Sequence, residues 1–460
     1  MATLISSTLN PTSPLLVPDI LHEVFRYLTP LEHLVPPAIP FDLFHSSLVC
    51  RCWHQEARPL LENIIDGTFR SLFYGYSCTE DESEQIANLL VESFHNGVSY
   101  PANLIERMTI NISRHLLHSD SNVNPFEKIL KLPLPKLNEL LLNIDNIPVL
   151  RLQRMNDIIT RIHPYCSTLT RLTIVGEGGG AKYHRGIQML IDTVSPRIKS
   201  LKLFRYVLCH RTIVALRRCT ALQEVEFHDI YHERDGETPV LSWPSLRRFH
   251  YSLAGKLKCS HLNKIFMNKT IAALAGCCPL LESLVFVTLG NSEWMLNIDR
   301  AYILLGRCRK LRQLCLAGDN SVDDNLLNFV LFRQGWLLEH IDLEGSTKLT
   351  GEGVQVWDGG WPKLRSLRLA GCTALRQSFV EKVVIAYPKI HEIVLPEHLD
   401  SGVRDFMKRN GFCRRANTWL KMEGWQPDVA MAVDNHVNCL QPTQQLPWFR
   451  RRISLRQLRQ

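Results

Sequence analysis

Membrane-spanning and secretory segments are missing from this 460-residue sequence. No apolar run reaches about eighteen residues, the length that a membrane-spanning helix needs. Residues 1–18 lack a basic segment followed by an apolar core, so we expect no secretory signal. These absences predict a protein of the cytoplasm, the nucleus or both, without a membrane partner.

Catalytic and metal-binding motifs are scarce as well. The fourteen cysteines include no Cys-x-x-Cys pair, which is the spacing of zinc ribbons and thiol redox enzymes. Two Cys/His groupings, at 50–54 and 436–439, lack a second pair of ligands. Residues 176–181 formally fit the dinucleotide-binding glycine pattern, but no acidic residue lies about twenty positions further on. We find no G-x-S-x-G elbow and no defensible Cys/His nucleophile and base. The sequence therefore predicts no metal, no cofactor and no catalysis by this chain.

Basic charge is present but concentrated at one end. The formal net charge is +8, and residues 450–460 contribute five arginines and no acid. The rest of the chain is only mildly basic. Because a charge run is more often a solvated tail than a binding site, we expect no nucleic-acid partner.

One leucine phrase recurs through most of the chain. Leu364-Arg-Ser-Leu367-Arg-Leu369 shows it: a leucine, two residues, a leucine, one residue, a leucine. The last two leucines have the period of a strand and leave Arg368 on the opposite face. Copies separated by 24 to 35 residues begin at Leu137, Leu169, Ile198, Leu222, Leu246, Leu281, Leu311, Leu338, Leu364 and Ile390, with a weaker copy at 105–110. This period and phrase indicate leucine-rich repeats.

The repeats predict an α/β fold. Each repeat should supply a strand, a turn and usually a helix, and parallel strands stacked about 4.8 Å apart would form a curved sheet with the helices outside. Cysteines three residues before several strand phrases are interpreted as small buried residues. Residues between the inward leucines would face the concave side, where a varied, rigid surface suits protein recognition. The predicted target-binding residues are Lys202, Phe204, Glu226, His228, His250, Asp342 and Arg368, although each one taken singly could be a solvated face residue.

The N-terminal region has a different pattern. Pro18 suits the first turn of a helix, and the residues after it form an apolar stripe at helical spacing. A proline-rich loop follows, and then Ser47-Leu-Val-Cys-Arg-Cys-Trp53 opens a second helical stretch. Over about 45 residues this pattern resembles the F-box, with one residue fewer after Pro18 and a longer loop at 29–42. The alternative is a purely structural role, in which these helices only cap the first repeat.

The resemblance to F-box/leucine-rich-repeat proteins implies a division of labour. A three-helix F-box would bind a Skp-type adaptor, and through it a cullin, by the apolar residues Pro18, Ile20, Leu21, Val24, Phe25, Leu28, Leu48, Val49 and Trp53. About fifty residues bury too little surface to be stable alone, and their surplus of apolar side chains also favours an interaction surface.

The expected domains follow from these patterns. They are a flexible N-terminus at 1–14, the F-box at 15–62, a helical linker at 63–103, a solenoid of about ten or eleven repeats at 104–400, and a cap with a basic tail at 401–460. The resemblance implies a substrate-recognition subunit of an SCF-type cullin–RING ubiquitin ligase, whose protein target the sequence leaves unknown. The alternatives are a leucine-rich-repeat scaffold without a role in ubiquitination and a receptor with a small-molecule pocket in the concave face.

Overall fold

The computed structural model describes much of the repeat region and the segment that follows it. The described residues are 71–74, 91, 105–111, 131–132, 134–144, 152–176, 185–232, 243–253, 261–288, 298–318, 320–356 and 361–422. The predicted F-box, with all its adaptor-contact residues from Pro18 to Trp53, lies outside them. Among the described helices, none combines the length and the apolar character that crossing a membrane requires.

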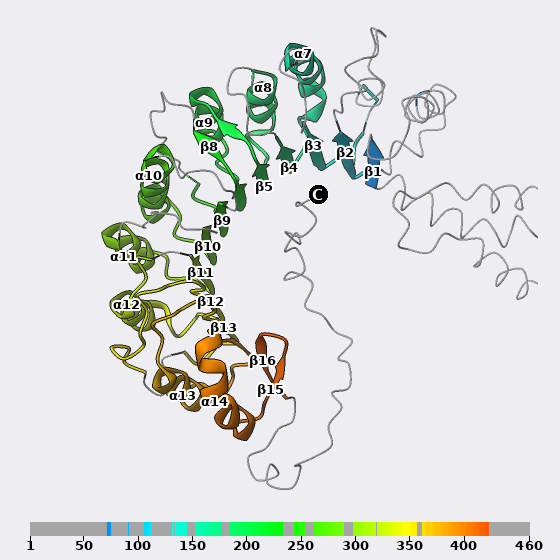
Figure 1. Ribbon diagram of the computed structural model, residues 1–460. Coiled ribbons are helices and arrows are strands. Elements are labelled where there is room, and N and C mark those ends of the chain that lie inside the picture. The colour runs from blue at the N-terminus through cyan, green and yellow to red at the C-terminus, as the bar shows by residue number, and fades with distance from the viewer. Residues whose placement is uncertain are drawn as a thin grey trace, which may run out of the picture.

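A single long sheet forms the inner side of an arc (Figure 1). Twelve of its fourteen strands run parallel, in the order of the chain. They are β1 (Ser71–Tyr74), β2 (Arg107–Asn111), β3 (Glu139–Asn143), β4 (Arg171–Val175), β5 (Ser200–Phe204), β7 (Glu224–His228), β9 (Arg248–Leu253), β10 (Ser283–Thr288), β11 (Gln313–Ala317), β12 (His340–Asp342), β13 (Ser366–Arg368) and β14 (Glu392–Val394). The predicted α/β class with a parallel sheet is confirmed for this part of the chain.

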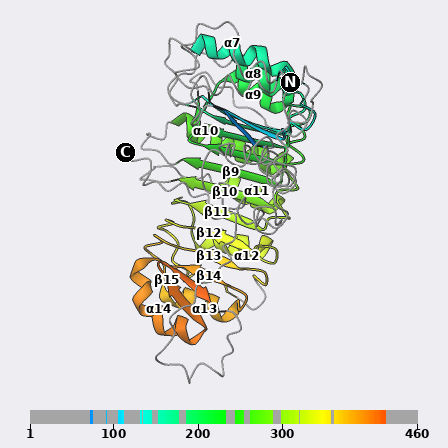
Figure 2. The ribbon, with the colours of Figure 1, turned by 90° about the vertical axis from the view of Figure 1, so that its right-hand side faces the viewer.

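Helices line the outer side of the same arc, one repeat after another (Figure 1). They are α7 (Leu152–Ile162), the short η3 (His163–Cys166), α8 (Arg185–Val194), α9 (His210–Arg217), α10 (His261–Cys277), α11 (Ile298–Arg307), α12 (Asp324–Gln334), α13 (Gln377–Ala386) and α14 (Glu397–Arg409). A short parallel pair, β6 (Val207–Leu208) with β8 (Tyr231–His232), forms a separate ladder. Figure 2 shows the main strands stacked as rungs along the length of the molecule.

The core lies between the sheet and the helices. Strand residues alternate between buried and partly exposed, as in β4 and β7, because successive side chains point to opposite faces. The register places each inward residue beside its counterpart in the next repeat, so that Leu172, Leu201 and Val225 form one buried row. The leucine phrase therefore fills a continuous core, which is the arrangement of leucine-rich repeats.

Buried cysteines occupy a repeated place in this core. Cys166, Cys219, Cys278 and Cys308 are each buried three residues before a strand phrase. The Cys278 Sγ donates to the Trp243 carbonyl oxygen at 3.3 Å. These thiols are small packing residues, in agreement with the interpretation made from the sequence.

An antiparallel hairpin ends the sheet. Strands β15 (Phe412–Arg415) and β16 (Thr418–Lys421) continue the sheet past residue 400, with β16 paired to β14 in the opposite direction. Trp419 is buried on β16, and its Nε1 donates to Asp400 Oδ1 at 3.0 Å. Arg414 Nη1 lies 2.5 Å from Asp400 Oδ2, so one carboxylate of α14 fixes both strands of the hairpin.

Candidate functional site

The concave face of the sheet gathers the polar strand residues into three rows. The register aligns residues of equivalent position across the rungs. The first row runs Glu139, Arg171, Ser200, Glu224, Arg248, Ser283, Gln313, His340, Ser366 and Glu392. The second runs Leu141, Thr173, Lys202, Glu226, His250, Val285, Cys315, Asp342, Arg368 and Val394. The third runs Asn143, Val175, Phe204, His228, Ser252, Val287 and Ala317. Because neighbouring rungs are hydrogen-bonded, the spacing between these side chains is fixed by the backbone.

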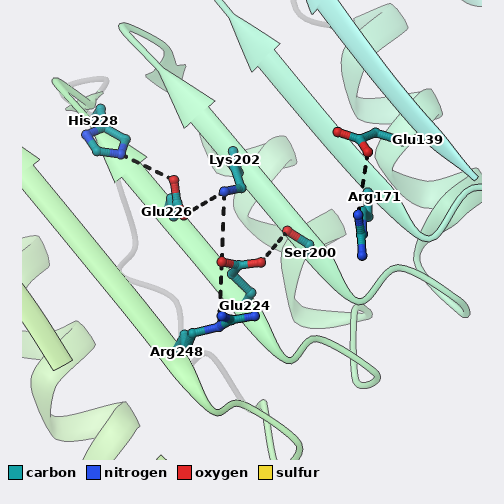
Figure 3. Close-up of polar contacts among 8 residues, drawn as sticks. All are labelled: Glu139, Arg171, Ser200, Lys202, Glu224, Glu226, His228 and Arg248. Carbon is teal, nitrogen blue, oxygen red and sulfur yellow. Dashed lines mark hydrogen bonds and ion pairs between the residues drawn. The ribbon is translucent and has the colours of Figure 1, made fainter. Parts of the chain in front are cut away.

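A network of charged residues connects strands β5, β7 and β9 (Figure 3). Lys202 Nζ lies 2.6 Å from Glu226 Oε1 and 3.8 Å from Glu224 Oε1. Ser200 Oγ donates to Glu224 Oε2 at 3.0 Å, and Arg248 Nε lies 3.6 Å from Glu224 Oε1. We call this network, together with the three aromatic side chains described next, the β5–β9 cluster. Its two carboxylates and two cations hold one another in place across three rungs.

Three aromatic rings stand beside the charges. The Phe204 and His228 rings stack with centroids 4.5 Å apart and an interplanar angle of 2°. The His228 and His250 rings are also 4.5 Å apart, tilted by 55°. His228 Nε2 lies 3.6 Å from Glu226 Oε2, which ties the rings to the charge network. The cluster thus combines an aromatic wall with paired charges.

The protonation states of the cluster follow from burial and neighbouring charge. Burial raises the pKa of Glu226, but hydrogen bonds from His228 and Lys202 and the positive charge of Lys202 outweigh it and lower the pKa to about 2. Burial, followed by the charge of His228, lowers the pKa of His250 to about 4. At neutral pH Glu226 is therefore ionised and His250 is neutral.

Small and apolar side chains occupy the middle rungs of the concave face. Val285, Cys315 and Ala317 are buried and pack together, with Val287 partly buried against them. Burial, followed by the charge of Asp342, raises the pKa of the Cys315 thiol well above its ordinary value, so this cysteine is a packing residue. The middle rungs offer an apolar contact between two polar regions.

A second set of charges lies on β12, β13 and β14. Arg368 Nη1 lies 3.1 Å from Glu392 Oε1, and Arg368 Nε lies 3.8 Å from Asp342 Oδ2. Ser366 Oγ donates to Glu392 Oε2 at 3.1 Å, and the Glu344 amide donates to Asp342 Oδ1 at 3.1 Å. We call these five residues the β12–β14 cluster. Arg368 pairs with two carboxylates, and Glu344 adds a third acidic residue to the cluster, so this end of the concave face is acidic.

The residues predicted from the sequence fall into these two clusters. Lys202, Phe204, Glu226, His228 and His250 lie together in the β5–β9 cluster, and Asp342 and Arg368 lie in the β12–β14 cluster. Their role in binding a target stays a prediction.

Ser200, Ser366 and Glu392 are further members of the clusters that were not among the predicted residues. The leucine phrase itself carries the missing signal, because each of these residues directly precedes an inward strand residue and therefore points to the concave side.

Metal binding has no support in the described residues. Among them, no group of three His, Cys, Asp or Glu side chains is arranged to hold a metal ion. The carboxylates of the two clusters pair with lysine and arginine instead. What the concave face offers chemically is hydrogen bonding, charge pairing and aromatic contact.

Comparisons with known proteins give structural likeness only. No protein-family model and no curated protein matches the chain. Among solved structures, the complex of Rad7 and Elc1 from yeast is similar at 12% identity and a TM-score of 0.45, with 79% of this chain and 93% of that chain covered. A protein from Bacteroides fragilis is similar at 12% identity and a TM-score of 0.33, with 72% and 82% covered. The leucine-rich repeat-containing protein LegL7 from Legionella pneumophila is similar at 13% identity and a TM-score of 0.34, with 67% and 87% covered.

Proposed function

We propose that the chain is a non-catalytic receptor that holds a protein target on its concave face for ubiquitination. Residues 15–62 would bind a Skp-type adaptor, and through it a cullin, in the cytoplasm, the nucleus or both. The adaptor part of the proposal rests on the F-box resemblance of Pro18 to Leu61. The target-binding part rests on the concave face.

The observation that carries the proposal is the preorganisation of the two clusters. Lys202, Glu226 and Arg368 are held by ion pairs of 2.6 to 3.8 Å on hydrogen-bonded strands, so little rotamer freedom remains to be lost when a partner binds. The apolar middle rungs lie between the clusters. A protein segment laid across the rungs would meet paired charges, aromatic rings, apolar side chains and an acidic cluster in a fixed order, which gives specificity.

The contribution of such a receptor to ubiquitination would be positioning. A target held on the concave face and an adaptor held by the N-terminal region share one chain, which raises the effective concentration of the target near the conjugating enzyme. No catalytic group is required of this chain for that role.

One experiment separates the two halves of the proposal. The full chain is expressed in cells as wild type, as Val24→Asp with Phe25→Asp, and as Glu226→Ala with Arg368→Ala. We expect the first variant to lose the adaptor and the cullin. We expect the second to keep both and to lose the ubiquitinated targets, as measured by quantitative mass spectrometry of the purified complexes.

Two outcomes would contradict the proposal. Retention of the adaptor by the Val24→Asp, Phe25→Asp variant would remove the docking claim. Recovery of concave-face partners without any ubiquitinated species would instead favour a leucine-rich-repeat scaffold that has no ligase role.

A further inference from the structure

Large apolar side chains are exposed on α11, on α12 and in the turn after α12. These helices lie on the outer side of the arc, across the sheet from the concave face (Figure 1). The exposed fractions are 52% for Ile303, 71% for Phe332 and 58% for Trp336. Tyr302 and Phe329 lie half-buried beside them. We call these five residues the outer aromatic patch. Scattered exposed apolar residues are normal, but a group on two packed helices marks an interaction surface.

The patch is ordered by contacts between its own members. The Tyr302 and Phe329 rings meet edge to face across the two helices, with centroids 4.7 Å apart. Phe329 also lies against Gly306 of α11, where a Cβ would make an ordinary contact of 3.6 Å with Phe329 Cζ. The Arg333 guanidinium lies 5.8 Å from the Phe329 ring centroid and 5.6 Å from that of Phe332. Tyr302, Phe329 and Phe332 therefore have fixed neighbours before any partner arrives.

Four exposed cations surround the patch. Arg333 stands within it, and Arg307, Arg309 and Lys310 are at or just after the end of α11, beside the end of α12 where Trp336 lies. Within the described part of the chain, none of the four forms an ion pair with a carboxylate. Helix dipoles favour cations at helix ends, but they do not account for three exposed apolar side chains at the same place.

Nearby acidic residues are already engaged or lie elsewhere. Glu339 Oε1 is 3.4 Å from Arg312 Nη1. Asp299 is in the first turn of α11, and Asp323 and Asp324 are at the start of α12, so all three are at the far ends of these helices from Trp336. Asp323 and Asp299 lie on the Tyr302 side of the patch, where they add to the rise that burial causes in the pKa of Tyr302. Among the described residues, the exposed charge around Trp336 is consequently positive.

We infer that the outer aromatic patch binds an acidic, amphipathic segment of a protein partner. An aliphatic or aromatic side chain of that segment would lie among Ile303, Phe332 and Trp336, while its carboxylates would meet Arg307, Arg333 and Lys310. The charge around the patch selects an acidic partner over a basic one. Four cations at one end of two helices are too few and too localised for the continuous basic groove that single-stranded nucleic acid requires.

This surface is distinct from the concave face, so it adds a second binding site to the receptor. A partner on α11 and α12 would leave the β5–β9 and β12–β14 clusters open. The inference does not depend on the identity of the target or on the adaptor.

The test uses the purified full-length chain and a labelled synthetic peptide. The peptide places leucine and phenylalanine at helical spacing on one face and glutamate elsewhere. We expect saturable binding, measured by fluorescence anisotropy. Phe332→Ser with Trp336→Ser should weaken the affinity about tenfold or more, because it removes two aromatic side chains of the kind that dominate binding energy at interfaces. Arg307→Glu with Arg333→Glu should weaken binding similarly. Tyr165→Ser, which removes a different aromatic with a 41% exposed fraction, is the matched control and should leave binding unchanged.

Several results would overturn the inference. One is the absence of saturable peptide binding, and another is equal binding of a peptide whose leucine and phenylalanine are replaced by serine. A third is that anionic vesicles or a single-stranded oligonucleotide bind more tightly than the peptide and depend on Phe332 and Trp336 for that binding. Concentration-dependent self-association that Trp336→Ser abolishes would assign the patch to a second copy of this chain instead. All four substituted residues are exposed, so circular dichroism of each variant should match the wild type.

Discussion

Individual residues of the concave face have strongly altered titration behaviour because charge and burial act on them together. Glu226 is held ionised by Lys202 and His228, whereas His250, one rung further, is held neutral. The Glu226 carboxylate therefore stays negatively charged, and the His250 imidazole stays uncharged, across the neutral pH range. A partner would meet the same charges throughout that range.

Acid should destabilise this cluster in two steps. The unfolded chain protonates His250 near pH 6.5, but the folded chain does so only near pH 4, so the unfolded state binds more protons between these values and stability falls as the pH falls through them. Glu226 acts in the same direction between about pH 4.5 and 2. In the wild type, His250 should lower the unfolding free energy by on the order of 3 kcal/mol at most as the pH falls from 6.5 to 4. We expect His250→Gln to remove this contribution, so that the unfolding free energy of the variant falls less over the same range. Denaturant titrations at several pH values measure this, and equal slopes in wild type and variant would contradict it.

The buried cysteines should be chemically inert. Burial, which is the main cause in each case, raises the pKa of the Cys166, Cys278 and Cys308 thiols to about 12, so almost no thiolate forms near pH 8. We expect iodoacetamide to leave these residues unmodified in the native chain while half-buried Cys277 and Cys413 react. Peptide mapping by mass spectrometry compares them. Equal modification of Cys277 and its neighbour Cys278 would show that the helix end opens readily.

At the scale of elements, one repeat replaces its helix by a clamped segment. The described residues 344–356, between β12 and β13, form no helix. Asp324 of α12 holds this segment by accepting hydrogen bonds from the Thr350 hydroxyl at 2.5 Å, the Gly351 amide at 2.8 Å and the Gly353 amide at 2.9 Å. Gly351 has a φ of +76°, and a Cβ there would lie 2.4 Å from the Phe379 ring, so only glycine fits.

Removal of the Asp324 charge should loosen this repeat. Asp324→Asn replaces one carboxylate oxygen by an amide nitrogen, which cannot accept a hydrogen bond. Either the Thr350 and Gly351 amides, which donate to Oδ1, or the Gly353 amide and the Thr350 hydroxyl, which donate to Oδ2, then lose their acceptor. We expect a loss of about 1–3 kcal/mol in unfolding free energy, which is the cost of leaving charge-assisted bonds unmade. Asp299→Asn, a first-turn aspartate of α11 with no such role, is the matched control. Thermal melts of both variants test this, and an equal shift in the two would refute the clamp.

Strands and their register could be predicted from the sequence far better than the side-chain pairings. The leucine phrase fixes which strand residues face inward, so Lys202, Glu226 and Arg368 were placed on the correct face. Which charges pair depends on distances between rungs that lie 24 to 30 residues apart in the chain, and the phrase contains no information about side-chain rotamers. The Asp324 clamp and the Arg414–Asp400–Trp419 contacts arise from single residues outside the repeating phrase, so periodicity could not reveal them.

At the scale of the whole molecule, the array depends on how its ends are covered. The last parallel strand, β14, has its outer edge occupied by β16, and Trp419 and Phe412 are buried there. An uncovered strand edge would present unpaired amide and carbonyl groups to other molecules. The hairpin therefore covers the edge of β14 and ends the sheet in β15, a short strand whose exposed cations Arg414 and Arg415 disfavour edge-to-edge association.

Truncation should reveal this protection. A chain ending at Arg409 loses β15 and β16, and we expect it to form oligomers or aggregates, whereas a chain ending at Met422 keeps the hairpin and should behave like the full chain. In the full chain, Trp419→Ala should cost about 3–5 kcal/mol through the lost burial and the cavity left behind. Light scattering with size-exclusion chromatography follows the truncations. A monomeric chain ending at Arg409 would argue against the protective role.

The hairpin on β14 also limits how such an array can change in length. Every parallel rung presents the same edge to its successor, so units could be duplicated or lost anywhere between β2 and β14 without disturbing the pairing rule. The edge of β14 is occupied by β16, so a further unit that pairs directly with β14 would have to displace the hairpin. Growth of the array during evolution would have to occur by insertion inside it, which would move the two clusters of the concave face apart by whole rungs and retune the length of segment that they accommodate.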